Sequence, residues 1–141
     1  MKSNFEKMTF KARMATFVGT IGLVWGSIAA AAPPASVTGY WSIIGNQSAG
    51  TLYLSQGYAT STCKPINGKI YTNDIVLGYY CPPTGRIAFY RKNSVGVSQA
   101  WVGNVSEVVT GQPQRMGGTF HALDMNAGSG LWAEYHFQGY K

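Results

Sequence analysis

The chain has 141 residues, of which 18 are glycine and 11% are charged, and its Lys and Arg residues outnumber its Asp and Glu residues by eleven to five. A chain of this length builds one domain around a single core, which excludes a multidomain protein. Glu, Lys and Leu, which favour helices, are scarce relative to Gly, Tyr, Thr and Ser, so we predict an all-β fold.

The first 31 residues have the layout of a secretory signal peptide. Four basic residues lie within the first thirteen positions, an apolar run follows from Met14 to Ile28, and alanines end the segment. The apolar run is shorter than the roughly twenty residues that span a bilayer, which disfavours the alternative of a transmembrane anchor. We expect cleavage before Ala32 and export of residues 32–141 as a secreted or periplasmic protein.

Cleavage at this point lowers the charge of the chain. Residues 32–141 hold seven cationic and four anionic side chains, a net charge of about +3. The cations are scattered, and only Arg91 and Lys92 are adjacent. Such a mild and dispersed excess favours solubility, and we expect no nucleic-acid partner.

After an extended lead-in that contains Pro33 and Pro34, eight segments follow that read as strands, most of them alternating apolar and polar residues. The expected strands are Thr38–Gly45, Thr51–Gln56, Thr60–Tyr71, Asp74–Cys81, Gly85–Asn93, Ser98–Glu107, Arg115–Leu123 and Leu131–Phe137. Short loops between consecutive strands are typical of an up-and-down meander, and closure removes both edges. We therefore predict that residues 32–141 form one eight-stranded antiparallel β-barrel. An outer-membrane barrel is the alternative, but most of these strands are short or carry charged residues.

The two cysteines, Cys63 and Cys81, are equidistant from Thr72 in the sequence. A chain reversal near Thr72 would place them opposite each other across a hairpin. Asn67-Gly68 is a strong hairpin signal by itself and competes with this reversal. Because only the later turn brings the cysteines together, we predict a Cys63–Cys81 disulfide and a bulge or bend at Asn67-Gly68, with two free thiols as the alternative.

The most regular hairpin spans Gly85–Glu107 and turns at residues 94–97. Strand alternation places Trp101 on the same face as Gln99 and Gly103. A glycine beside a large ring gives that ring room to lie across the sheet. We expect this face to line the barrel interior.

Four short motifs lie on the first, fifth, sixth and seventh of the expected strands. They are Gly39-Tyr40-Trp41, Ala88-Phe89-Tyr90-Arg91-Lys92-Asn93, Gln99-Ala100-Trp101-Val102-Gly103 and Thr119-Phe120. Together they resemble the avidin and streptavidin family of secreted eight-stranded barrels, and more loosely the lipocalins. The resemblance implies the barrel fold and a binding mode in which a small ligand lies in the barrel cup.

The resemblance does not imply that biotin is the ligand. Tyr90 and Phe120 stand where the family has tryptophans, and Gln99 stands where it has a threonine. The strand after Trp41 also lacks the asparagine that the family uses. Because each unsatisfied polar group of a buried ureido ring costs roughly 1–3 kcal/mol, we expect biotin to bind weakly or not at all.

Residues 32–141 offer few groups for acid–base or metal chemistry. His121 and His136 lie on the last two expected strands, and Glu134 shares a face with His136. They are candidates for a metal pair or a His–Glu dyad, with polar wall residues as the alternative. No supporting motif accompanies these residues, and the sequence has no nucleophilic Ser motif, phosphate loop or Cys–His pair. We expect a protein that is not an enzyme and that holds no metal or cofactor.

Five large aromatic residues either form a ligand cup or fill the barrel. They are Trp41, Tyr90, Trp101, Phe120 and Trp132. The leading interpretation is a secreted, non-enzymatic barrel that holds an unidentified small ligand, and an internal void would favour it. Its candidate ligand-binding residues are Tyr90, Gln99, Trp101 and Phe120.

The alternative is a protein-binding module, for example an inhibitor of an extracellular hydrolase. It would act through loops such as Gly111–Gln114 and Asn126–Gly130, and a filled barrel with an exposed aromatic patch would favour it. Four tyrosines are expected on the surface, where amphipathic rings suit a protein or glycan contact: Tyr53, Tyr58, Tyr79 and Tyr80. Either function is compatible with a homo-oligomer.

Overall fold

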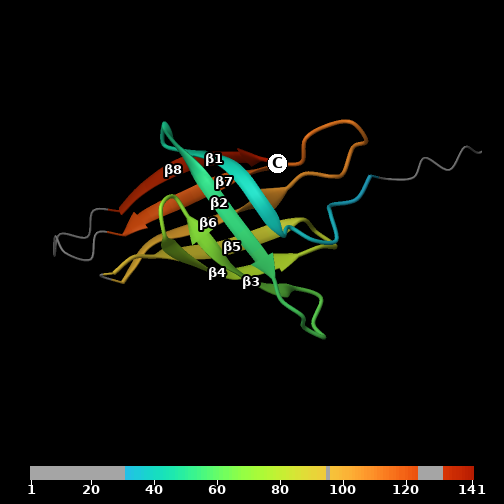
Figure 1. Ribbon diagram of the computed structural model, residues 1–141, viewed down its shortest axis with the longest axis horizontal. Coiled ribbons are helices and arrows are strands. Elements are labelled where there is room, and N and C mark those ends of the chain that lie inside the picture. Colours follow the sequence, from blue (N-terminus) through green and yellow to red (C-terminus); the bar gives the residue numbers. More distant parts are fainter. Residues whose placement is uncertain (1–30, 95, 124–131) are drawn as a thin grey trace, which may run out of the picture.

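The computed structural model describes residues 31–94, 96–123 and 132–141, and they form a closed antiparallel β-barrel (Figure 1). The eight strands are β1 (Gly39–Gly45), β2 (Ser48–Gln56), β3 (Lys64–Ile70), β4 (Asp74–Cys81), β5 (Arg86–Lys92), β6 (Val97–Val105), β7 (Arg115–Leu123) and β8 (Trp132–Tyr140). Each strand pairs with the next, and β8 returns to pair with β1. This confirms the predicted fold class. The proposed signal peptide, apart from Ala31, and the loop Asn126–Gly130 lie outside the described residues.

No helix among the described residues is long and apolar enough to cross a membrane. Strand bounds differ from the expected ones mainly at β3, which begins at Lys64 rather than Thr60, and at β8, which extends to Tyr140 rather than ending at Phe137. The residues before Lys64 form a protruding β2–β3 loop. Pairing with β1 and β7 carries the last strand beyond its apolar pattern.

The predicted irregularity at Asn67-Gly68 is wrong. Asn67 pairs with Leu77 and Gly68 with Val76, and the register between β3 and β4 is unbroken. A register shift occurs instead between β5 and β6, at Arg91 and Lys92. Gly68 serves a different purpose, because an added Cβ there would lie 1.8 Å from the carbonyl oxygen of Tyr53. The glycine therefore allows a close approach of β2 and β3 rather than a turn.

The reversal near Thr72 and the disulfide are both present. Ile70 pairs with Asp74 around the turn, and Cys63 is bonded to Cys81. The bond anchors the β2–β3 loop to the end of β4, so the protruding loop is fixed at its base.

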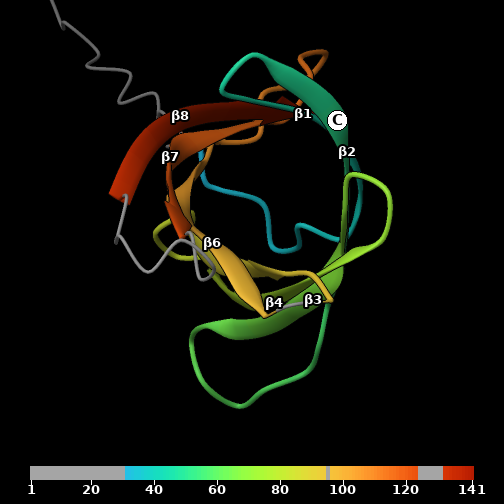
Figure 2. The same ribbon diagram turned by 90° about the vertical axis from the view of Figure 1, so that its left-hand side faces the viewer.

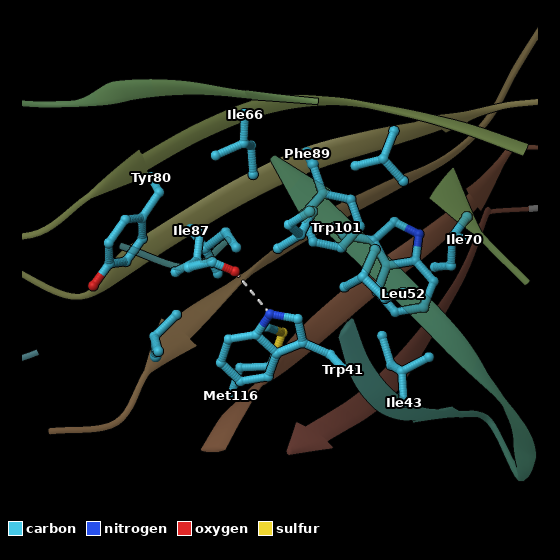
Figure 3. Close-up of a cluster of buried hydrophobic side chains, with 14 of the residues drawn as sticks. Trp41, Ile43, Leu52, Ile66, Ile70, Tyr80, Ile87, Phe89, Trp101 and Met116 are labelled. Atoms are coloured by element: carbon cyan, nitrogen blue, oxygen red, sulfur yellow. Dashed lines mark hydrogen bonds between the residues drawn. The ribbon is translucent and has the colours of Figure 1, made fainter. Parts of the chain in front are cut away.

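Apolar side chains fill the middle of the barrel (Figure 3). Trp41, Leu52 and Ile70 are fully buried, and Trp101 is 1% exposed. The burial pattern of β1 alternates strictly, with Trp41 and Ile43 inside and Tyr40, Ser42 and Ile44 outside. The interior is a packed core of the kind expected for a small barrel.

The lead-in segment Ala32–Val37, here called the strap, lies across one end of the barrel (Figure 2). The Tyr80 hydroxyl donates to the Pro34 carbonyl at 2.7 Å, and Trp41 Nε1 donates to the Val37 carbonyl at 2.9 Å. Both hydrogen bonds are buried, and Val37 is fully buried. The strap therefore closes this end, which we call the far end, and the opposite end is the mouth.

Candidate functional site at the barrel mouth

The mouth holds a depression of about 340 Å³. Its lining comes from the ends of β1 and β2, the β3–β4 turn and the interior faces of β5–β8: Gly45, Asn46, Ser48, Ala49, Tyr71, Arg91, Gln99, Phe120 and Tyr135. Asn46 and Gln47 form the tight β1–β2 turn with positive φ values of 45° and 69°. Such two-residue turns match the twist of a hairpin and keep this rim short.

Three of the four predicted site residues meet here. Gln99 and Phe120 line the depression, and Trp101 lies directly beneath, with its Nε1 donating to Gln99 Oε1 at 3.2 Å. The predicted position of Trp101 on the interior face with Gln99 and Gly103 is confirmed. Since Trp101 is buried, it contributes to the floor rather than to an open wall.

Tyr90 does not belong to this group, and the expectation that it lines the interior is wrong. On β5 the side chains of Ile87 and Phe89 point inward, and Tyr90 is 38% exposed on the outer face. Phe89 takes the place that Tyr90 was expected to occupy, because it pairs across the sheet with Trp101. Ala88 and Tyr90 make the other face of β5 apolar too, so the sequence of this strand does not mark which face turns inward.

The floor of the mouth is an aromatic stack. The Trp101 ring lies between Phe120, 4.2 Å away and 13° from parallel, and Phe89, 5.4 Å away and 16° from parallel. Tyr135 extends the stack from Phe120 at 5.3 Å. Offset stacks of this kind add roughly 0.5–1.5 kcal/mol per pair beyond area burial, so the stack stabilises the floor.

A half-buried ion pair forms one wall. Arg91 donates to Asp74 Oδ2 from Nε at 2.6 Å, with Nη2 at 2.5 Å from the same oxygen, and donates from Nη1 to Gln99 Oε1 at 3.3 Å. Gln99 Oε1 thus accepts from both Arg91 and Trp101. This fixes the orientation of the Gln99 amide and leaves the two hydrogens of its Nε2 without an acceptor among the described residues.

Tyr71 covers the mouth from the β3–β4 turn, and sequence reasoning missed it. Its φ is +56°, a left-handed conformation that is unusual for an aromatic residue. Its N–H donates to the Thr51 carbonyl at 2.8 Å, and its ring occupies the space above Gly50, where an added Cβ would lie 2.4 Å from Cδ1. The sequence signal for a ring at this position was Gly50, because a glycine inside an alternating strand indicates a close approach of another group.

The hydroxyl of Tyr71 has a raised pKa. Burial raises the pKa of its hydroxyl, and the nearby Arg91 guanidinium partly offsets this increase. The guanidinium lies over the Tyr71 ring at 4.8 Å. The phenol therefore remains neutral at physiological pH and is available as a hydrogen-bond donor.

The residues considered for metal or acid–base chemistry lie elsewhere. His121 pairs with Glu134 across β7 and β8, and Glu134 and His136 are exposed on the outer face of the barrel. Within the described ranges, no group of three or more His, Cys, Asp and Glu residues is arranged to hold a metal ion. The mouth itself combines hydrogen-bonding groups with an aromatic floor.

The loop Gly111–Gln114 of the alternative function lies at the far end. The Gln114 backbone exchanges two hydrogen bonds with Lys141, each 3.0 Å long, which ties this loop to the end of the chain.

Comparison with known proteins gives no match to a family model, and no significant similarity to a curated protein or to a solved structure.

Proposed function

We propose that this protein is an exported, non-enzymatic binding protein that holds a small ligand at the mouth of its barrel. The observation that carries the proposal is the fixed Gln99 amide, which presents two hydrogens in a depression above an aromatic floor. A concave site that combines apolar surface with a few oriented polar groups is the usual form of a ligand site. The disulfide supports the exported part, because such bonds persist in oxidising compartments.

The geometry limits the size and charge of the ligand. The depression of about 340 Å³ lies at the low end of the usual range for ligand sites, about 300–1,000 Å³. Arg91 is engaged by Asp74 and Gln99 and has its charge compensated within the site. The proposed ligand is therefore a small, neutral ring compound with an oxygen that accepts from Gln99 Nε2 and the Tyr71 hydroxyl.

The site differs from the cup that the avidin resemblance implies. The middle of the barrel is filled, so the ligand would sit above Trp101 rather than beside it. Phe120 and Tyr135 supply the apolar contact, and Tyr71 supplies the cover. Biotin remains an expected weak binder or non-binder.

The proposal is tested with residues 32–141 purified without denaturation. Intact mass under native conditions reveals any retained small molecule. Neutral ring compounds, and biotin as a separate anionic probe, are titrated by chemical-shift mapping. Gln99→Leu and Tyr71→Phe should each abolish or strongly weaken binding. The matched control is Asn104→Leu, which changes an exposed amide on the same strand. Equal binding by Gln99→Leu and Asn104→Leu would show that the mouth is not the site.

Two observations favour the second candidate, a protein-binding module. The middle of the barrel is filled rather than hollow, as expected for that function. Tyr58 is 90% exposed on the β2–β3 loop, whose base the disulfide fixes. A rigid loop with an exposed aromatic anchor is typical of a recognition loop. Inhibition of an extracellular hydrolase that Tyr58→Ala removes, while Gln99→Leu leaves it intact, would select this function instead.

A further inference from the structure

The outer face of β4, β5 and β6 carries a contiguous apolar surface. Leu77 pairs with Tyr90, and Tyr90 pairs with Ala100. In the next row Tyr79 pairs with Ala88, which pairs with Val102. The large members of both rows are 38–43% exposed. We call these six residues the outer apolar face.

Cations stand at both ends of the outer apolar face. Toward the mouth, Ile75 pairs with Lys69 on one side and with Lys92 on the other. Toward the far end, Arg86 pairs with Cys81 and Asn104. Lys92 and Arg86 are six residues apart on one strand, a span of about 20 Å. Asp74, the acidic residue that immediately precedes Ile75, forms its ion pair with Arg91 at the mouth.

This charge arrangement disfavours a second copy of the chain as the occupant. A two-fold axis that stacks two such faces must lie in the plane of contact. When the axis runs along or across the strands, it brings each cationic end against a cationic end, whether the mouth of one copy meets the mouth or the far end of the other. Like charges placed together in this way oppose association. An anionic surface complements both ends at once.

The residue types favour a lipid surface over an acidic protein. Lysine is depleted at protein interfaces, whereas lysines beside an apolar segment are the usual contact with anionic lipids. Tyr79 and Tyr90 have the amphipathic rings that settle at the level of lipid headgroups. Neither Lys92 nor Arg86 forms an ion pair with another described residue.

We propose that the outer apolar face, with Lys69, Lys92 and Arg86, docks the protein peripherally on anionic lipid bilayers. The aliphatic and tyrosine side chains enter the headgroup region, and the cations contact lipid phosphates. The contact lies on the side of the barrel, so the mouth stays open to solvent. Docking is therefore independent of ligand binding at the mouth.

The test is co-sedimentation of residues 32–141 with vesicles of phosphatidylcholine containing 30% phosphatidylglycerol, against vesicles of phosphatidylcholine alone. We expect binding to the anionic vesicles only, weakened by added salt. Lys92→Gln should lower the affinity about five-fold, and removal of Lys69 as well should lower it by about five-fold more. The matched control is Arg115→Gln, which removes one cation from an exposed position on β7, outside the face.

The apolar contribution is tested with a second pair of variants. Leu77→Ser should weaken vesicle binding, whereas Val109→Ser changes an exposed valine of the β6–β7 loop and should not. Circular dichroism checks that each variant is folded. Equal affinity for both vesicle types, or equal effects of Lys92→Gln and Arg115→Gln, would overturn the proposal. So would a concentration-dependent dimer that Leu77→Ser dissociates, because it would assign the face to a second copy.

Discussion

The two ends of the barrel cover the apolar core in different ways. At the far end the strap brings its own backbone over the core, and buried side chains satisfy its carbonyl groups: Tyr80 bonds Pro34, and Trp41 bonds Val37. At the mouth the chain supplies polar side chains instead, with the Arg91–Asp74 pair and Gln99 above the aromatic stack.

The two ends therefore differ in how much stability is lost when a hydrogen-bond partner is removed. A buried carbonyl with a partner costs little, but one that loses its partner costs roughly 1–3 kcal/mol, so the far end tolerates few changes. Half-exposed polar groups at the mouth exchange their partners for water at low cost. The far end therefore contributes stability, and the mouth is left free for the ligand binding proposed above.

The largest expected effect comes from the shared core, where it approaches the mouth. Trp101→Ala should lower the free energy of unfolding by about 3–5 kcal/mol, because a fully buried ring is removed from between Phe89 and Phe120. Urea unfolding measures the loss, with Tyr140→Ala as an exposed control. A loss near 1 kcal/mol would mean that the mouth extends down to Trp101 and that the division between the ends is misplaced.

The disulfide should give the next largest effect. Replacing both Cys63 and Cys81 by Ala should cost about 3 kcal/mol, because the bond closes a loop of eighteen residues that the unfolded chain would otherwise explore. Thermal unfolding with and without reductant gives the same comparison in the wild type. An unchanged melting temperature would contradict the stabilising role given to the far end.

Alkaline pH should test the far end through Tyr80. Burial raises the pKa of Tyr80 to about 12, against about 10 for an exposed tyrosine. Because the pKa of Tyr80 is higher in the folded state than in the unfolded state, the neutral hydroxyl contributes to the free energy of unfolding. This contribution is complete below pH 10 and is lost as the pH rises toward 12. Between pH 9 and 12 the wild type should lose roughly 2–3 kcal/mol more than Tyr80→Phe. Parallel losses in the two proteins would contradict the buried hydrogen bond to Pro34.

The smallest effect is expected for the ion pair at the mouth. Asp74→Asn should change the free energy of unfolding by less than about 1 kcal/mol, since the Arg91 and Asp74 side chains are 23% and 26% exposed. Its effect should appear in ligand binding, because the variant alters the charge beside Gln99. A loss as large as that of Tyr80→Phe at neutral pH would remove the contrast between the two ends.

The strand pattern of the sequence determined most of the barrel. Eight alternating segments with short connections led to the right strand order, and the symmetry of the cysteines about Thr72 led to the right turn and disulfide. The face of β6 that carries Gln99 and Trp101 was also predictable, because Gly103 marks the side with room for a large ring. These features depend on neighbours along the chain or on one strand pair.

What only the tertiary structure decided is which apolar face turns inward. On β4, Ile75, Leu77 and Tyr79 alternate with Val76 and Tyr80, so both faces are apolar and a one-residue choice buries Tyr80 and exposes Tyr79. The same ambiguity misplaced Tyr90. The contacts of the strap were likewise hidden, because its partner Tyr80 lies far along the sequence. The position of Tyr71 was hidden because it depends on a positive φ at that residue. Alternation with a period of two separates the residues of a strand into two faces but does not say which face is buried. Closure of the barrel decides this.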